Sequence, residues 1–73
     1  PIKDIIDIAV EKNRLTKNLL NLEANLVKIE NKLNNKNFIE KAPSNIIEEN
    51  LNKKVNYNNE INSVKELLKI LSN

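Results

Sequence analysis

The chain has 73 residues and a formal net charge of +2, and it contains no cysteine, histidine or glycine. These absences exclude disulfides, zinc sites built from cysteine or histidine, glycine-rich phosphate loops and nucleophiles that depend on a Cys/His pair. The length allows one small domain at most, and the charge is weaker than that of a typical nucleic-acid-binding tail.

The first half of the chain carries a heptad pattern. Its apolar residues recur at alternating intervals of three and four, which predicts the apolar strip of a coiled-coil helix. They are Ile5, Ile8, Leu15, Leu19, Leu22, Leu26, Ile29 and Leu33. The pattern predicts a helix from about residue 4 to about residue 35, with Lys12 as the one interruption. Asp4 and Asp7 near its start match the helix dipole.

The pattern lapses between Asn37 and Pro43. A proline removes a hydrogen bond from a helix interior, but it is tolerated in the first turn. We therefore predict a turn over about residues 36–42 and a second helix over about residues 43–71. Phe38 is expected to close this end of the helix pair, and stacking on a nucleic-acid base is the alternative.

The second half repeats the heptad pattern with one gap, at Asn58. Its apolar strip is expected to consist of Ile47, Leu51, Val55, Ile61, Val64, Leu68 and Leu71. In an antiparallel pair, facing residue numbers have a constant sum; both strips fit a sum of about 80, which places Leu19 opposite Ile61. This agreement predicts an all-α fold, an antiparallel two-helix coiled-coil hairpin. Lys12 and Asn58 either fix its register or are simply tolerated.

A basic stripe is predicted along one flank of the first helix. Its charged members are Arg14, Lys17, Lys28 and Lys32, and the neutral Asn21 lies between Lys17 and Lys28 on the same stripe. Glu23 and Glu30 fall on the other flank. Each basic side chain could neutralise one backbone phosphate of a nucleic acid, and the alternative is the ordinary solvated face of a charged helix. Lys53 and Lys54 on the second helix are a second, weaker candidate.

The open end of the predicted hairpin carries apolar residues that the helix pair does not use. They are Ile2, Ile6, Val10, Leu67 and Ile70. Exposed apolar patches usually mark an interface, so this end is expected to dock against a preceding domain or a second copy. The serines and the threonine have no base nearby in the sequence, and no catalytic or metal-binding residue is expected.

The turn and its flanks also resemble a known family. The resemblance is to the C-terminal hairpin of bacterial valyl-tRNA synthetases, and it rests on the run Lys32-Leu33-Asn34-Asn35-Lys36-Asn37-Phe38-Ile39-Glu40-Lys41-Ala42-Pro43, followed by Ile46-Ile47. In that family a leucine-heptad helix leads into an L-x-N-x-x-F-[V/I]-x-K-A-P turn. The first helix is similar as well, at Asp7, Glu11, Arg14-Leu15, Lys17, Leu19, Leu22-Glu23 and Glu30.

The resemblance implies that the chain is a fragment of a larger valine–tRNA ligase, an ATP-dependent enzyme whose catalytic domain lies elsewhere. With no signal peptide and no long apolar run in the sequence, a cytoplasmic location is the default expectation. The fragment would be a coiled-coil arm that contacts the outer corner of the valine-accepting tRNA through its shape and backbone. Its contact residues would be Arg14, Lys17, Lys28 and Lys32. The arm would need no cofactor, and its base would meet the preceding domains of the same protein.

Two other functions compete with this one. The first is a structural coiled-coil module for oligomerisation or partner docking, with no role in RNA binding. The second is a membrane-surface helix, which is disfavoured because the helix pair itself consumes the apolar strip. The sequence contains no apolar run near the length of a membrane span, and no membrane partner is expected.

Overall fold

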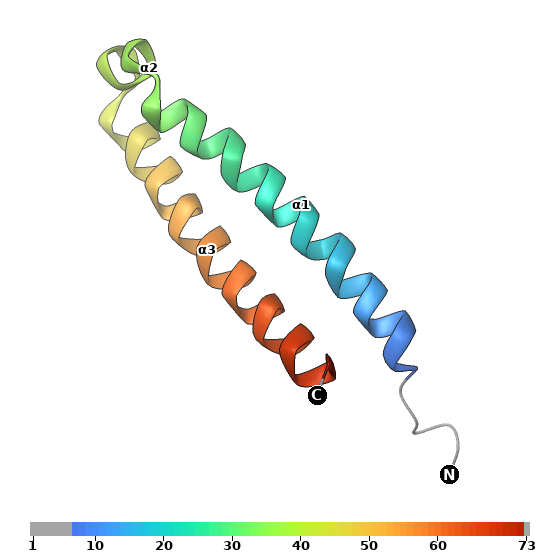
Figure 1. Ribbon diagram of the computed structural model, residues 1–73. Helices are drawn as coiled ribbons and strands as arrows, with labels where there is room; N and C mark the ends of the chain where they lie inside the picture. Colours follow the sequence, from blue (N-terminus) through green and yellow to red (C-terminus); the bar gives the residue numbers. More distant parts are fainter. Residues whose placement is uncertain (1–6, 73) are drawn as a thin grey trace.

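The structure is a computed structural model that describes residues 7–72. Within these residues it contains three helices, α1 (Ile8–Asn34), α2 (Lys36–Lys41) and α3 (Ser44–Ser72). The long helices α1 and α3 run antiparallel and side by side, and α2 closes one end of the pair (Figure 1). The molecule extends over 58 × 17 × 16 Å. The predicted all-α hairpin is confirmed, but the segment predicted as a turn holds a short helix.

The first helix begins at Ile8 because Asp7 caps it. The Asp7 backbone is extended, and its Oδ1 accepts a hydrogen bond from the Val10 N–H at 3.3 Å. Its carbonyl accepts one from the Glu11 N–H at 3.0 Å. An aspartate at this position satisfies one of the free N–H groups of the first turn. The start predicted near residue 4 is therefore too early, and Asp4 itself lies outside the described residues.

Asn35 ends α1 and starts α2. Its backbone leaves the helical region, with φ −81° and ψ 111°, while its N–H still donates to the Lys32 carbonyl at 3.1 Å. Its side-chain Oδ1 accepts hydrogen bonds from the N–H groups of Asn37 at 3.0 Å and Phe38 at 3.4 Å. Asparagine suits this role because its short side chain reaches the backbone of the next turn. This cap explains why α2 is a helix and not an open turn.

Replacing Asn35 by alanine should lower the free energy of unfolding by about 1 kcal/mol, because α2 loses the side-chain acceptor of its first turn. Asn34→Ala is the matched control, since Asn34 is exposed and should change stability by less than about 0.5 kcal/mol. Urea unfolding followed by circular dichroism measures both variants. Equal stability of the two would show that the cap contributes nothing.

The chain returns at Ala42 and Pro43. The Ala42 N–H donates to the Phe38 carbonyl at 2.8 Å, and its backbone is extended, as the residue before a proline prefers. The Pro43 carbonyl accepts hydrogen bonds from the N–H groups of Ile46 at 3.0 Å and Ile47 at 3.2 Å. Pro43 thus stands just ahead of α3, where its missing N–H costs no helical hydrogen bond. Phe38, on α2, is half-buried.

The core lies between α1 and α3. It is centred on four buried residues, Leu15, Leu22, Ile61 and Val64. The partly buried residues that pack against them are Leu19, Leu26, Tyr57, Leu68 and Leu71. Leu19 thus packs on the cluster that contains Ile61, as the predicted register requires. Nearer to α2, the buried residues are Ile29 and Asn50, so the apolar core is thinner in that half of the rod.

The apolar strip predicted for α3 is wrong between Ile47 and Ile61. Leu51 and Val55, which were expected to face α1, are 48% and 57% exposed. Asn58, expected as a polar gap in the strip, is exposed too. The prediction placed the apolar side chains inward because burial of apolar surface is normally favourable. In this stretch the structure turns them outward.

The positions that take their place are Asn50, Lys54 and Tyr57. Asn50 is only 7% exposed, and its Nδ2 donates to the Ile46 carbonyl one turn back at 2.8 Å. Lys54 and Tyr57 are half-buried. With these three residues, the strip keeps a strict alternation of three and four along the whole of α3. That alternation lets one side of the helix face α1 from end to end.

Candidate nucleic-acid interface

The four residues predicted to contact a nucleic acid are all exposed on α1. They are Arg14, Lys17, Lys28 and Lys32. From Arg14 to Lys32 the helix rises by roughly 27 Å, at 1.5 Å per residue. Among residues 7–72, no carboxylate forms an ion pair with Lys17, Lys28 or Lys32. These three ammonium groups are therefore open to an external anion.

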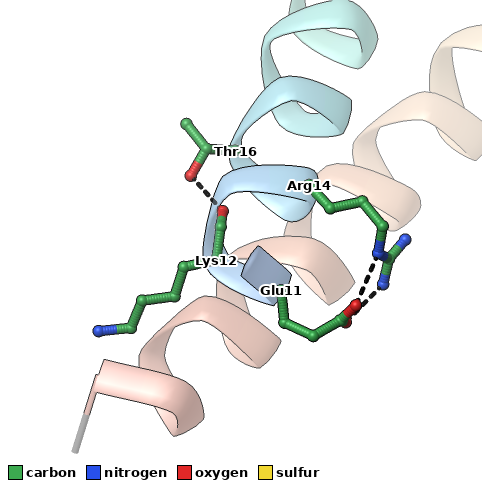
Figure 2. A network of polar contacts seen from close by, with 4 residues as sticks. All are labelled: Glu11, Lys12, Arg14 and Thr16. Atoms are coloured by element: carbon green, nitrogen blue, oxygen red, sulfur yellow. Dashed lines mark hydrogen bonds and ion pairs between the residues drawn. The ribbon is translucent and has the colours of Figure 1, made fainter. Parts of the chain in front are cut away.

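Arg14 differs because Glu11 already binds its guanidinium group (Figure 2). The Nε of Arg14 donates to Oε1 of Glu11 at 2.9 Å, and Nη2 donates to Oε2 at 2.8 Å. The hydrogen bonds from Arg14 favour the charged carboxylate and so lower the pKa of Glu11 from its usual value. The pair carries no net charge, and Arg14 attracts a phosphate less strongly than the lysines do.

Lys12 and Thr16 lie beside this ion pair without joining it. The Thr16 hydroxyl donates to the Lys12 carbonyl at 2.7 Å. In Figure 2 the Lys12 side chain points away from Arg14. Lys12 is half-buried on the strip that faces α3, which is typical of a lysine that packs its stem and keeps its ammonium group in water.

The acidic residues of α1 that come after Arg14 lie on the opposite flank from Lys32. Glu23 and Glu30 are half-buried there, and Glu30 lies two positions, or about 200° around the helix, from Lys32. The Oε2 of Glu30 is 4.0 Å from Nζ of Lys54 on α3. The negative charge of this part of α1 is thus turned away from the lysine side and toward α3.

Other kinds of site find little support in the described residues. Residues 7–72 hold no group of three or more acidic, histidine or cysteine side chains that could bind a metal ion. A shallow depression on α3 is lined by Asn62, Ser63, Glu66 and Leu67, and these residues form no nucleophile–base pair. No helix in residues 7–72 has the length and apolar character that crossing a membrane requires. The exposed lysines of α1 are the strongest candidate site.

Comparison with known proteins places the chain in a family. The family described as "Valyl tRNA synthetase tRNA binding arm" matches residues 7–72. The chain belongs to this family. Three relatives that match the arm are each a "Valine--tRNA ligase": those of Lacticaseibacillus casei (35% identity over 97% of the chain), Petrotoga mobilis (38% over 99%) and Clostridium acetobutylicum (34% over 97%). The chain spans 8% of the length of each. No solved structure matches it.

Membership in the tRNA binding arm family confirms the resemblance expected from the turn between Asn35 and Pro43. The roles of the four basic residues of α1 stay predictions. The sequence interpretation overlooked that Glu11 neutralises Arg14, although a pair three residues apart on a helix is a recognisable signal. It also could not assign Lys53 to a flank, because that assignment depends on which residues of α3 face α1.

Proposed function

We propose that this chain is the tRNA-binding arm of a larger valine–tRNA ligase and that it binds the outer corner of the tRNA that accepts valine. The family match over residues 7–72 carries this proposal. Because the chain spans only 8% of the Lacticaseibacillus casei relative, catalysis belongs to the rest of such a protein. The arm itself adds affinity for tRNA, works in the cytoplasm and needs no cofactor.

The distribution of charge on α1 supports contact with a phosphate backbone. Lys17, Lys28 and Lys32 are exposed and carry no ion pair within residues 7–72. A lysine that neutralises a phosphate adds affinity without reading the base sequence. The outer corner of tRNA, where the D and T loops meet, offers a distinctive shape and backbone. A narrow rod with a few open cations suits that kind of recognition.

Binding of valine-accepting tRNA by the chain, measured over a range of salt concentrations, tests the proposal. We expect the affinity to fall steeply with salt. The double variant Lys28→Gln/Lys32→Gln should weaken binding about tenfold and reduce the salt slope by about two, because two phosphate contacts are lost. Arg14→Gln should have a smaller effect, of about twofold, because Glu11 already neutralises Arg14.

An RNA control separates corner recognition from general attraction to RNA. An acceptor–T-arm minihelix lacks the D loop and cannot form the outer corner, so it should bind more weakly than the whole tRNA. Equal binding of both RNAs would argue against the corner as the contact. An unchanged affinity of the double lysine variant would argue against the basic flank of α1.

We also propose that the open end of the hairpin packs against the rest of the longer protein. Ile8, Val10, Leu67 and Ile70 are exposed at this end, and such clusters usually mark interfaces. Ile2 and Ile6, predicted for the same patch, lie outside the described residues. The isolated chain should bind an apolar dye, and the same arm within the ligase should not. A dimer mass in solution would instead support the structural module that oligomerises.

A further inference from the structure

Lys53 of α3 lies on the same flank of the hairpin as Lys28 and Lys32, the lysines of α1 nearest to the end that α2 closes. On α1, Lys32 directly precedes Leu33 of the strip that faces α3, and Lys28 lies one turn earlier. On α3, Lys53 directly precedes Lys54 of the facing strip. In an antiparallel pair, residues that precede equivalent strip positions lie on the same side of the two helices.

The ion pair between Glu30 and Lys54 marks the other side. Lys54 leaves the strip toward Glu30, with Nζ and Oε2 4.0 Å apart. Glu30 is about 200° around α1 from Lys32, so Lys54 reaches out on the flank opposite Lys32. Leu51 lies on this flank too, and Lys53, two positions further along α3, is about 200° from Leu51. In the half of the hairpin nearer to α2, one flank thus carries Glu30 and Leu51. The other flank carries three lysines, Lys28, Lys32 and Lys53.

The charge of Lys53 is only loosely held. Its Nζ lies 3.5 Å from Oε1 of Glu49 on the same helix, and the two side chains are 54% and 57% exposed. Exposed pairs of this kind are weak and screened by salt. A phosphate group can therefore exchange with Glu49 as the partner of Lys53.

We propose that Lys28, Lys32 and Lys53 form one phosphate-binding cluster that spans both helices, and that Glu49 weakens this cluster by holding Lys53. The RNA then lies over the flank that carries these lysines, near the closed end, and the flank with Glu30 faces away from it. This inference rests on the proposed function, because it requires the arm to bind RNA. It joins Lys53 to the lysines of α1, whereas the sequence offered Lys53 and Lys54 only as a second, weaker candidate on the other helix.

The first test compares two lysines of α3 that lie on opposite flanks. Lys65 directly follows Val64 of the facing strip, which puts it on the Glu30 flank, and it is exposed. Lys53→Gln should weaken binding of valine-accepting tRNA about three- to fivefold and lower the salt slope by about one. Lys65→Gln removes the same charge and should change the affinity less than about twofold.

The second test removes a negative charge at one of two neighbouring glutamates, which should raise the affinity for tRNA instead of lowering it. Glu49→Gln releases Lys53 and should raise the affinity about two- to threefold. Glu48→Gln changes the net charge equally but lies on the flank of Glu30, so it should raise the affinity less. Equal effects within both pairs of variants would overturn the shared cluster. If Lys28→Gln/Lys32→Gln still weakens binding in that case, tRNA binding by the arm stands and only the part assigned to α3 fails.

Discussion

The variant Leu22→Ala should lose about 2–4 kcal/mol of unfolding free energy, because it opens a cavity in the centre of the helix pair. Leu22 is one of four buried residues in the main core cluster. A chain of this size rarely has a net stability of more than a few kcal/mol. The substitution should therefore leave the chain largely unfolded at room temperature, as measured by circular dichroism at 222 nm.

Leu20→Ala is the matched control for this prediction. Leu20 stands two positions away on the same helix, is 62% exposed and takes no part in the core, so its loss should cost less than about 0.5 kcal/mol. If Leu22→Ala is too unstable to measure, Ile61→Val removes one methylene group from the same cluster and should cost about 1 kcal/mol in urea unfolding. Equal effects at Leu20 and Leu22 would contradict the observed facing side of α1.

The side of α1 that faces α3 could be predicted because its leucine heptads are compatible with only one choice of buried residues. Leu15, Leu22 and Ile29, spaced by seven residues, are all buried as the pattern required. Along this helix the apolar residues and the regular alternation of three and four indicate the same strip. Where the two signals agree within the body of the pair, periodicity determines which residues are buried. The prediction is wrong for Ile8, one heptad before Leu15 in the same strip, which is 50% exposed at the open end.

The two signals disagree in the first half of α3. Between Ile47 and Ile61 the apolar residues favour Leu51 and Val55, but this route has steps of four and four followed by three and three. Such a run makes the helix rotate relative to its partner within two heptads. The regular route keeps the face straight and buries much of Tyr57, a larger apolar body than valine. Composition alone could not weigh helix geometry against the burial of two aliphatic side chains.

The candidate site was predictable in part for the same reason. Exposure of the four basic residues of α1 follows from the strip that faces α3, and it was predicted correctly. The place of Lys53 follows from the strip of α3, which was predicted one position out at this point. A shift of one residue turns a helix by about 100°, enough to move Lys53 from one flank to another. The charge pattern of the hairpin thus depends on the packing of its core.

Asn50 provides the sharpest test of that packing. It is 7% exposed, and within residues 7–72 its side-chain amide bonds only to the Ile46 carbonyl of its own helix, so no hydrogen bond of Asn50 ties α3 to α1 there. Leucine at this position would bury a larger apolar side chain near Ile29, and the Ile46 carbonyl would keep its backbone partner in the helix. We expect Asn50→Leu to raise the free energy of unfolding by about 1–2 kcal/mol.

The control for Asn50→Leu is the same substitution two positions along the helix. Asn52 is exposed, so Asn52→Leu gains only the better helix propensity of leucine, which should raise the free energy of unfolding by about 0.4 kcal/mol. The difference between the two variants in urea unfolding therefore measures burial at position 50. If Asn50→Leu gains no more than Asn52→Leu, and Leu51→Ala proves strongly destabilising, α3 packs through Leu51 after all. In that case Lys53 would also leave the flank shared with Lys28 and Lys32, and the cluster across both helices would fall with it.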